Sequence, residues 1–228
     1  MAGNKKADKN AFIIWFLYPV PLLILICIWY SVTAADESKQ FIFSSPIKVY
    51  EAAVRLVVSG ELLANAWITL FEALLGFILG TISGALIGLT LWSSRLVALV
   101  AKPYITALAT VPIFALAPII IAWFGIDIKS KVALAFLSTV CVAIVQSYQG
   151  AMSVDERFLR QMQVVGATRF QTFRLVVVPS SIIWVLNAMK LNIGLALMGA
   201  FIGEFISSEC GLGYMIVKAS GLYDMATV

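Results

Sequence analysis

The feature that most constrains this chain is a set of long apolar segments almost free of charge. Residues 12–32 carry no charged side chain, and residues 65–92 carry only one, Glu72. A helix that crosses a bilayer needs about 20 mostly apolar residues, so both segments are long enough. Since 61% of the 228 residues are hydrophobic and only 12% are charged, a water-soluble fold is excluded and the expected solvent is the bilayer.

We predict an all-α membrane protein with five visible spans, at residues 12–32, 65–92, 96–124, 132–148 and 176–207. The first is interpreted as an uncleaved span because it is too long for the apolar part of a secretory signal and contains Pro19 and Pro21. Residues 46–59 are expected to form a short amphipathic helix outside the bilayer, and residues 125–131 a turn. A cytoplasmic N-terminus leaves more basic residues inside than outside, as the positive-inside rule requires.

Four glycines recur at every fourth position of the second span, at Gly76, Gly80, Gly84 and Gly88. This spacing places small residues on one helix face and lets another helix backbone approach closely. Two partners stay open for this glycine stripe: a neighbouring span of the same chain, or a second copy in a homodimer.

Three prolines, Pro103, Pro112 and Pro118, interrupt the third span, and Pro112 and Pro118 each remove a helix hydrogen bond. Membrane helices tolerate this where protein or a water-filled cavity satisfies the freed carbonyl group. The prolines therefore mark either a packed kink or the lining of a translocation path.

Three ionisable residues fall within or near spans: Glu72, Lys190 and Glu204. Charge inside a membrane is costly and by default functional. We expect an ion pair between Glu72 and Lys190 on neighbouring spans. Extension of each side chain to its nearer interface and direct contact with a solute are the alternatives.

The segment 150–179 predicts two short helices joined at a glycine on the cytoplasmic side. Ser153–Glu156 has the pattern of a capping box that begins an amphipathic helix over residues 154–165. Gly166 would end that helix, and Thr168–Gln171 is a second capping box. The segment is either a passive surface loop or a docking site for a cytoplasmic partner. One side of the first helix would carry Val154, Phe158, Met162 and Val165.

From Gly166, nine residues lead to Val176 and the close Val177-Val178-Pro179, a pattern that resembles the EAA signature of bacterial ABC importer permeases. Further motifs are similar to the nitrate/sulfonate/taurine-type subgroup, and the similarity extends from residue 44 to the end of the chain. They include Ser45-Pro46, Thr69-Leu70, Pro103, Trp123-Phe124-Gly125, Ser130-Lys131 and Gly211-Leu212-Gly213-Tyr214.

The resemblance implies one type I ABC importer transmembrane domain over residues 1–228, with five of an expected six spans visible. A last span would follow the Gly211–Gly213 segment, and we expect the chain to lack it. Residues 150–174 would be the coupling-helix region that contacts an ATPase. The contacts are expected at Glu156, Arg157, Arg160, Gln161, Gly166, Ala167, Thr168 and Arg169.

The resemblance also implies the partners: cytoplasmic ABC ATPase subunits, a periplasmic or lipid-anchored solute-binding protein, and a second permease, identical or paired. The setting would be the bacterial inner membrane and its lipid, with no nucleic acid. No G-x-x-x-x-G-K-[ST] phosphate loop is present in the sequence. We therefore expect no cofactor on this chain, with ATP and Mg bound by the partner ATPase. The expected solute is nitrate, a sulfonate, taurine or a related small compound.

The chain departs from the family pattern at two places. Arg160-Gln161-Met162 stands where the signature opens with Glu-Ala-Ala, and Glu72 stands where an arginine is common. A secondary transporter or channel, the alternative function, would require inverted repeats and a chain of intramembrane carboxylates. A membrane enzyme would need a polar constellation at the interface, and the sequence contains no histidine.

Overall fold

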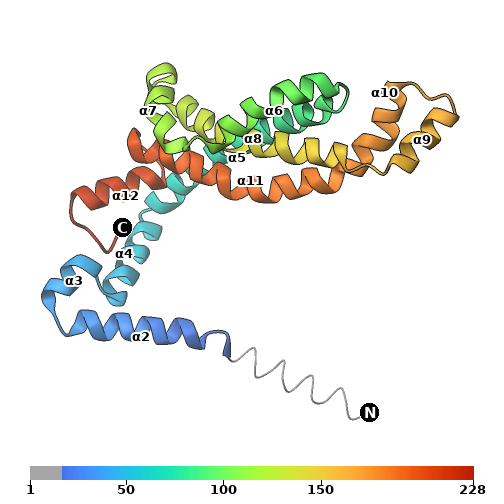
Figure 1. The fold of residues 1–228 in the computed structure, drawn as a ribbon. Helices are drawn as coiled ribbons and strands as arrows, with labels where there is room; N and C mark the ends of the chain where they lie inside the picture. Colours follow the sequence, from blue (N-terminus) through green and yellow to red (C-terminus); the bar gives the residue numbers. More distant parts are fainter. Residues whose placement is uncertain (1–16) are drawn as a thin grey trace, which may run out of the picture. The chain divides into compact units, whose positions relative to one another are not determined.

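The computed structural model describes residues 17–228, and over this range every regular element is helical (Figure 1). The chain divides into two compact units, residues 1–62 with 216–228 and residues 63–215. We describe each unit by itself. Part of the expected first span, residues 12–16, lies outside the described residues. The prediction of a single transmembrane domain over residues 1–228 stays a prediction.

In the described residues 17–62, the first unit contains α2 (Val20–Ala34), α3 (Glu37–Phe43) and α4 (Pro46–Val58), and it also includes the later part of α12 (Leu212–Gly221). The Ser45 hydroxyl accepts a hydrogen bond from the Lys48 amide, and Pro46 occupies the first turn, where a missing N–H costs nothing. These two residues fix the start of α4. The short helix predicted at residues 46–59 is confirmed, and its position outside the bilayer stays a prediction.

Three helices of the second unit are long and apolar enough to cross a membrane: α5 (Glu61–Leu91), α8 (Ile128–Met152) and the continuous helix Arg169–Ile206. The last comprises α10 (Arg169–Thr172), a π-helical turn (Phe173–Val177) and α11 (Val178–Ile206). The predicted spans at 65–92, 132–148 and 176–207 correspond to these helices. The total of five or six spans stays a prediction.

The predicted third span is two helices, α6 (Arg95–Thr110) and α7 (Ile113–Phe124), bent by 94° between them. Val111 and Pro112 have extended backbone angles at the break, because proline lacks the N–H that would continue the helix. Pro118 lies inside α7, where neighbouring Ala117 and Ile120 are buried against Leu134 of α8. The bent pair can serve as one span or as a re-entrant segment.

The glycine stripe of α5 lies against α8 of the same chain. A methyl group on Gly80 would overlap the Thr139 hydroxyl, and one on Gly84 would lie 2.6 Å from the Ala143 methyl. Real side chains do not approach so closely, so only glycine permits this helix spacing. Of the two partners left open by the sequence, the neighbouring span occupies the stripe.

The turn predicted at residues 125–131 is shorter than expected. Helix α8 begins at Ile128, and Lys131, in its first turn, is only 1% exposed. The charged and polar residues of this segment suggested a solvated turn. However, Asp127 is the last residue with an extended backbone, and α8 starts directly after it.

Candidate functional site

A short helical hairpin lies beyond the ends of α8 and α11, as Figure 1 shows for α9 (Glu156–Val164) and α10. We call residues 155–172 the α9–α10 segment. Helix α9 begins where the Asp155 carboxylate accepts a hydrogen bond from the Arg157 amide. The predicted capping box at Ser153 is wrong, because the Ser153 hydroxyl donates instead to the Gly150 carbonyl group at the end of α8.

The turn between α9 and α10 is closed at both ends by hydrogen bonds. The Gly166 amide donates to the Gln163 carbonyl group and the Ala167 amide to that of Met162, which together form a Schellman motif. Gly166 has φ +75°, a conformation that side chains with a Cβ adopt only at a cost. Thr168 and Gln171 then form the predicted capping box, with both hydrogen bonds present. The turn therefore has one defined geometry.

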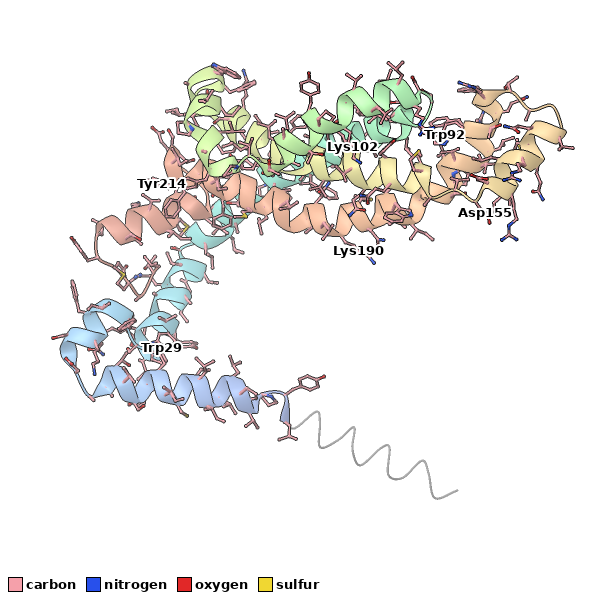
Figure 2. The ribbon with its side chains drawn as sticks, viewed as in Figure 1. Trp29, Trp92, Lys102, Asp155, Lys190 and Tyr214 are labelled. Carbon is pink, nitrogen blue, oxygen red and sulfur yellow. The ribbon has the colours of Figure 1, made fainter. Side chains whose placement is uncertain are left out.

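The α9–α10 segment is packed onto the ends of the spans. Buried Ala151 of α8, Val154 and Val177 form a small core, and Leu159 of α9 packs against it. The Trp92 ring, just past the end of α5, stacks on the Phe173 ring with centroids 6.0 Å apart. In Figure 2 the label Trp92 marks the end of α5 and the label Asp155 marks the start of α9. Packing in this small core therefore connects α9 with the ends of three long apolar helices.

The outer surface of the segment combines exposed apolar side chains with paired charges. Arg157 and Asp155 lie 3.3 Å apart, and Arg160 and Glu156 lie 2.6 Å apart. Ion pairs this exposed add little stability, so they serve mainly to order the side chains. The large apolar side chains left exposed are Phe158, Val164, Val165 and Phe170.

A second candidate site lies inside the second unit, where the Glu204 carboxyl group of α11 accepts hydrogen bonds from two other segments. The Thr69 hydroxyl of α5 donates to Glu204 Oε1 at 2.6 Å, and the Gly213 amide donates to Oε2 at 2.7 Å. The Leu212 amide donates to Thr69 Oγ1, and the Gly211 amide to Asn65 Oδ1. A side chain on Gly211 would overlap the Glu204 carboxyl group, so glycine is required there.

Glu72 and Lys131 complete this buried cluster. Glu72 is 2% exposed and Glu204 and Lys131 are each 1% exposed. The Lys131 ammonium group donates to the Ile126 carbonyl group and interacts electrostatically with both carboxyl groups. A buried charge persists only with compensating partners. The cluster, together with Thr69 and residues 211–213, joins α5, α8 and α11 near the end opposite the α9–α10 segment.

The comparisons with known proteins agree with this architecture. The family described as "binding-protein-dependent transport system inner membrane component" matches residues 74–228. A probable ABC transporter permease protein of Brucella melitensis is 30% identical over 200 residues, covering 88% of this chain and 80% of that protein. The chain belongs to this permease family.

Two other relatives are named for their transport systems. The riboflavin transport system permease protein RibX of Chloroflexus aurantiacus is 32% identical over 206 residues, 90% of this chain and 77% of RibX. SsuC of Bacillus subtilis, named for aliphatic sulfonates transport, is 29% identical over 196 residues, 86% of this chain and 71% of SsuC. The ABC permease family is thus established, and the resemblance stated from the sequence is confirmed.

The predicted pairing of Glu72 with Lys190 in this permease is wrong. Lys190 is exposed on α11 and points away from the other helices (Figure 2). Among the described residues, the charged groups that interact with Glu72 are Glu204 and Lys131. Glu204, which lies about 21 Å farther along α11 than Lys190, is the residue beside Glu72.

Sequence reasoning missed Lys131, Thr69 and Asn192 as buried polar residues. Asn192 donates to Thr81 Oγ1 at 2.9 Å and to the Thr139 carbonyl group at 3.2 Å, linking α11 to α5 and α8. The sequence did contain one indication that Glu72 is buried, because Glu72 stands four residues before Gly76 and so shares the helix face that meets α8. In residues 17–228, no group of three or more His, Cys, Asp or Glu could hold a metal ion.

Proposed function

We propose that this chain is the permease subunit of an ATP-driven importer and that its α9–α10 segment docks on a cytoplasmic ATPase subunit. ATP and Mg would be bound and hydrolysed on that partner. A periplasmic or lipid-anchored binding protein would deliver the solute, and a second permease, identical or paired, would complete the path. The N-terminus would lie in the cytoplasm.

The observation that carries this proposal is the exposed apolar surface on a short hairpin outside the spans. Phe158 is 54% exposed, Val165 82% and Phe170 69%. Large apolar side chains exposed together on a short polar segment are typical of an interaction surface. Arg157 and Arg160 flank them, already held by acids of the same helix. The expected contacts at Glu156, Gln161, Gly166, Ala167, Thr168 and Arg169 lie on the same segment.

The connection to the spans supports transmission of force. Leu159 ties α9 to the end of α8, and the Trp92–Phe173 stack ties α5 to the start of the Arg169–Ile206 helix. A π-helical turn at Phe173–Val177 precedes Pro179, and such turns occur often at functional sites. A shift of the docked hairpin would then re-orient the spans as a group, and open the path on one side of the membrane.

The path itself would run beside the bent pair α6–α7. Pro112 marks the 94° bend, and broken helices in transporters commonly line the solute site. Pro118, Glu72, Lys190 and Glu204 were the other candidates for the path. Burial of Glu72 and Glu204 favours a structural role for both, whereas Lys190 and the residues near Pro112 are open to a partner or solute.

The solute we propose is a small compound of the nitrate, sulfonate or taurine kind. The similarity to SsuC supports it, whereas RibX is named for a riboflavin transport system. Uptake assays with the cognate binding protein, run with taurine, nitrate and riboflavin, separate these classes. Selective uptake of riboflavin would overturn the proposed solute class without affecting the ATPase docking.

Cross-linking tests the docking directly. We would replace Cys27, Cys141 and Cys210 by serine, introduce Gln161→Cys on α9, and co-express the chain with its ATPase carrying surface cysteines. We expect a cross-linked permease–ATPase product. Glu209→Cys is the matched control, because it is exposed just past the other end of α11, about 43 Å away along a helix of 29 residues. A product with Glu209→Cys and none with Gln161→Cys would contradict the proposal.

A further inference from the structure

A cavity of about 410 Å³ lies between the ends of α5 and α8 and the α9–α10 segment. Its polar lining includes Arg95 at the start of α6, Arg169 at the start of α10, Gln163 and Thr172. Trp92 and Tyr148 add aromatic faces. The buried carboxyl cluster is separate from it, whereas Ala167 and Arg169 line it and also belong to the expected ATPase contacts.

The two arginines of this cavity differ from those on the outer face of α9. Arg157 and Arg160 each have an acidic partner on their own helix. Within the described part of the chain, the side chains of Arg95 and Arg169 have no hydrogen bond or ion pair, and no residue that lines the cavity is acidic. Two unpaired guanidinium groups facing one cavity favour a ligand with negative charge, and guanidinium groups match phosphate oxygens in geometry.

The depth of the cavity in the membrane indicates the source of that ligand. It opens where two spanning helices end, at Leu91 and Met152, and Trp and Tyr gather at the level of lipid headgroups. Leu91, Met152 and Leu159 give it apolar walls, which suit the glycerol and upper acyl carbons of a lipid. A volume of several hundred Å³ is also larger than a free phosphate ion requires.

We propose that this cavity binds the phosphodiester headgroup of an anionic phospholipid, with Arg95 and Arg169 as the phosphate contacts. The assignment to the cytoplasmic leaflet rests on the proposed function, which places the α9–α10 segment in the cytoplasm. Basic pockets between spans on that side commonly hold anionic headgroups. A bound lipid would join α6 to α10 at the base of the docking segment.

Native mass spectrometry of the full chain in a neutral detergent tests the proposal. The purified permease is mixed with equal amounts of phosphatidylglycerol and phosphatidylcholine. We expect one phosphatidylglycerol to be retained in preference to phosphatidylcholine. The double variant Arg95→Gln with Arg169→Gln should weaken retention about 30-fold, equal to about 2 kcal/mol at about 1.4 kcal/mol per tenfold.

Two further variants keep the test specific. Lys102→Gln with Arg174→Gln removes the same charge from residues that do not line this cavity, and retention should change less than about threefold by the same conversion. Arg95→Lys with Arg169→Lys keeps the charge and should keep the preference for phosphatidylglycerol, which shows that any loss in the Gln variant is not a folding defect.

Three results would overturn the proposal. The first is equal loss in the Arg95/Arg169 and Lys102/Arg174 variants, which means non-specific attraction. The second is displacement of the lipid by inorganic phosphate alone at millimolar concentration, which means a soluble anion site. The third is phosphatidylglycerol bound to the isolated chain but absent from the permease–ATPase complex, which means that the cavity is a subunit contact. The first two results do not bear on whether the ATPase docks, and the third is observed in a permease–ATPase complex that has formed.

Discussion

The Thr69 hydroxyl group lies 2.6 Å from Oε1 of Glu204, a residue 135 positions later in the chain. Thr69 also accepts a hydrogen bond from the Leu212 amide, so one side chain joins α5, α11 and the start of α12 (Leu212–Gly221). All three groups are shielded from solvent or nearly so. This part of the permease is held by hydrogen bonds between segments, where lipid provides no hydrophobic drive.

Replacing Thr69 by valine keeps the shape and removes both hydrogen bonds. Because Glu204 and the Leu212 amide would be left without this partner, we expect a loss of about 1–3 kcal/mol. At about 2–4 °C per kcal/mol for a chain of this size, the melting temperature in detergent should fall by several degrees. Thr90→Val is the matched control, since the Thr90 hydroxyl bonds only to the Ile87 carbonyl group of its own helix. An equal fall in both variants would contradict the proposed link.

The glycine stripe gives a second prediction. In Gly80→Ala the new methyl group would meet the Thr139 hydroxyl and lie 2.9 Å from the Phe136 carbonyl oxygen. Overpacking of this kind costs about 1–3 kcal/mol. Gly194→Ala on α11 meets nothing within 4 Å and should be neutral. Thermal unfolding of both variants in detergent distinguishes them, and equal stability would mean that α5 and α8 are not packed through Gly80.

Gly166 tests the geometry of the α9–α10 turn without removing any contact. Nothing lies within 4 Å of a methyl group placed there, but its φ of +75° is strained for alanine by about 1–2 kcal/mol. Asparagine tolerates this conformation better. We therefore expect retention of the ATPase in pull-down to decrease from Gly to Gly166→Asn to Gly166→Ala. If Gly166→Asn retained less ATPase than Gly166→Ala, the volume of the side chain and not the backbone angle would determine binding.

The C-terminal segment carries a pH-dependent contact. Hydrogen bonds from Thr227 are the main reason that the pKa of Asp224 is lowered, and Arg55 at 3.4 Å contributes. A lowered pKa means that the contact is fully present above the ordinary value of about 3.9 and is lost as the pH falls through the folded-state pKa.

Carbon-13 NMR of aspartate-labelled protein, with Asp224→Asn for assignment, measures this midpoint. Thr227→Val should raise it toward the ordinary value, because both the hydroxyl donor and the ordered turn are weakened. Thr90→Val should leave it unchanged. An unaltered midpoint in Thr227→Val would mean that Arg55, and not Thr227, sets the pKa of Asp224.

Sequence patterns predicted the features that depend on local rules. Gly166, the Thr168–Gln171 capping box and the start of α4 follow from backbone geometry and capping chemistry, which a single chain segment contains. The glycine spacing likewise predicted a close helix contact. Each of these features could be predicted because residues of these types seldom occur in that order without the corresponding structure.

The polar cluster could not be predicted in the same way. Which position along α11 lies beside Glu72 depends on the packing of three helices, so Lys190 was paired with Glu72 although Glu204 is its neighbour. Lys131 was placed in a turn because charged residues usually lie outside a span. Its burial is stabilised by carboxyl groups on two other helices, and no local pattern contains that information.

We propose that ATP hydrolysis on a partner drives solute through this permease by way of the α9–α10 segment. The most direct measurement is uptake of radiolabelled taurine into proteoliposomes that contain the permease, its ATPase and its binding protein. Scrambling residues 156–164, with Leu159 kept in place to preserve packing, should abolish ATP-driven uptake while the permease keeps its melting temperature. Uptake at the wild-type rate with the scrambled helix would contradict the account.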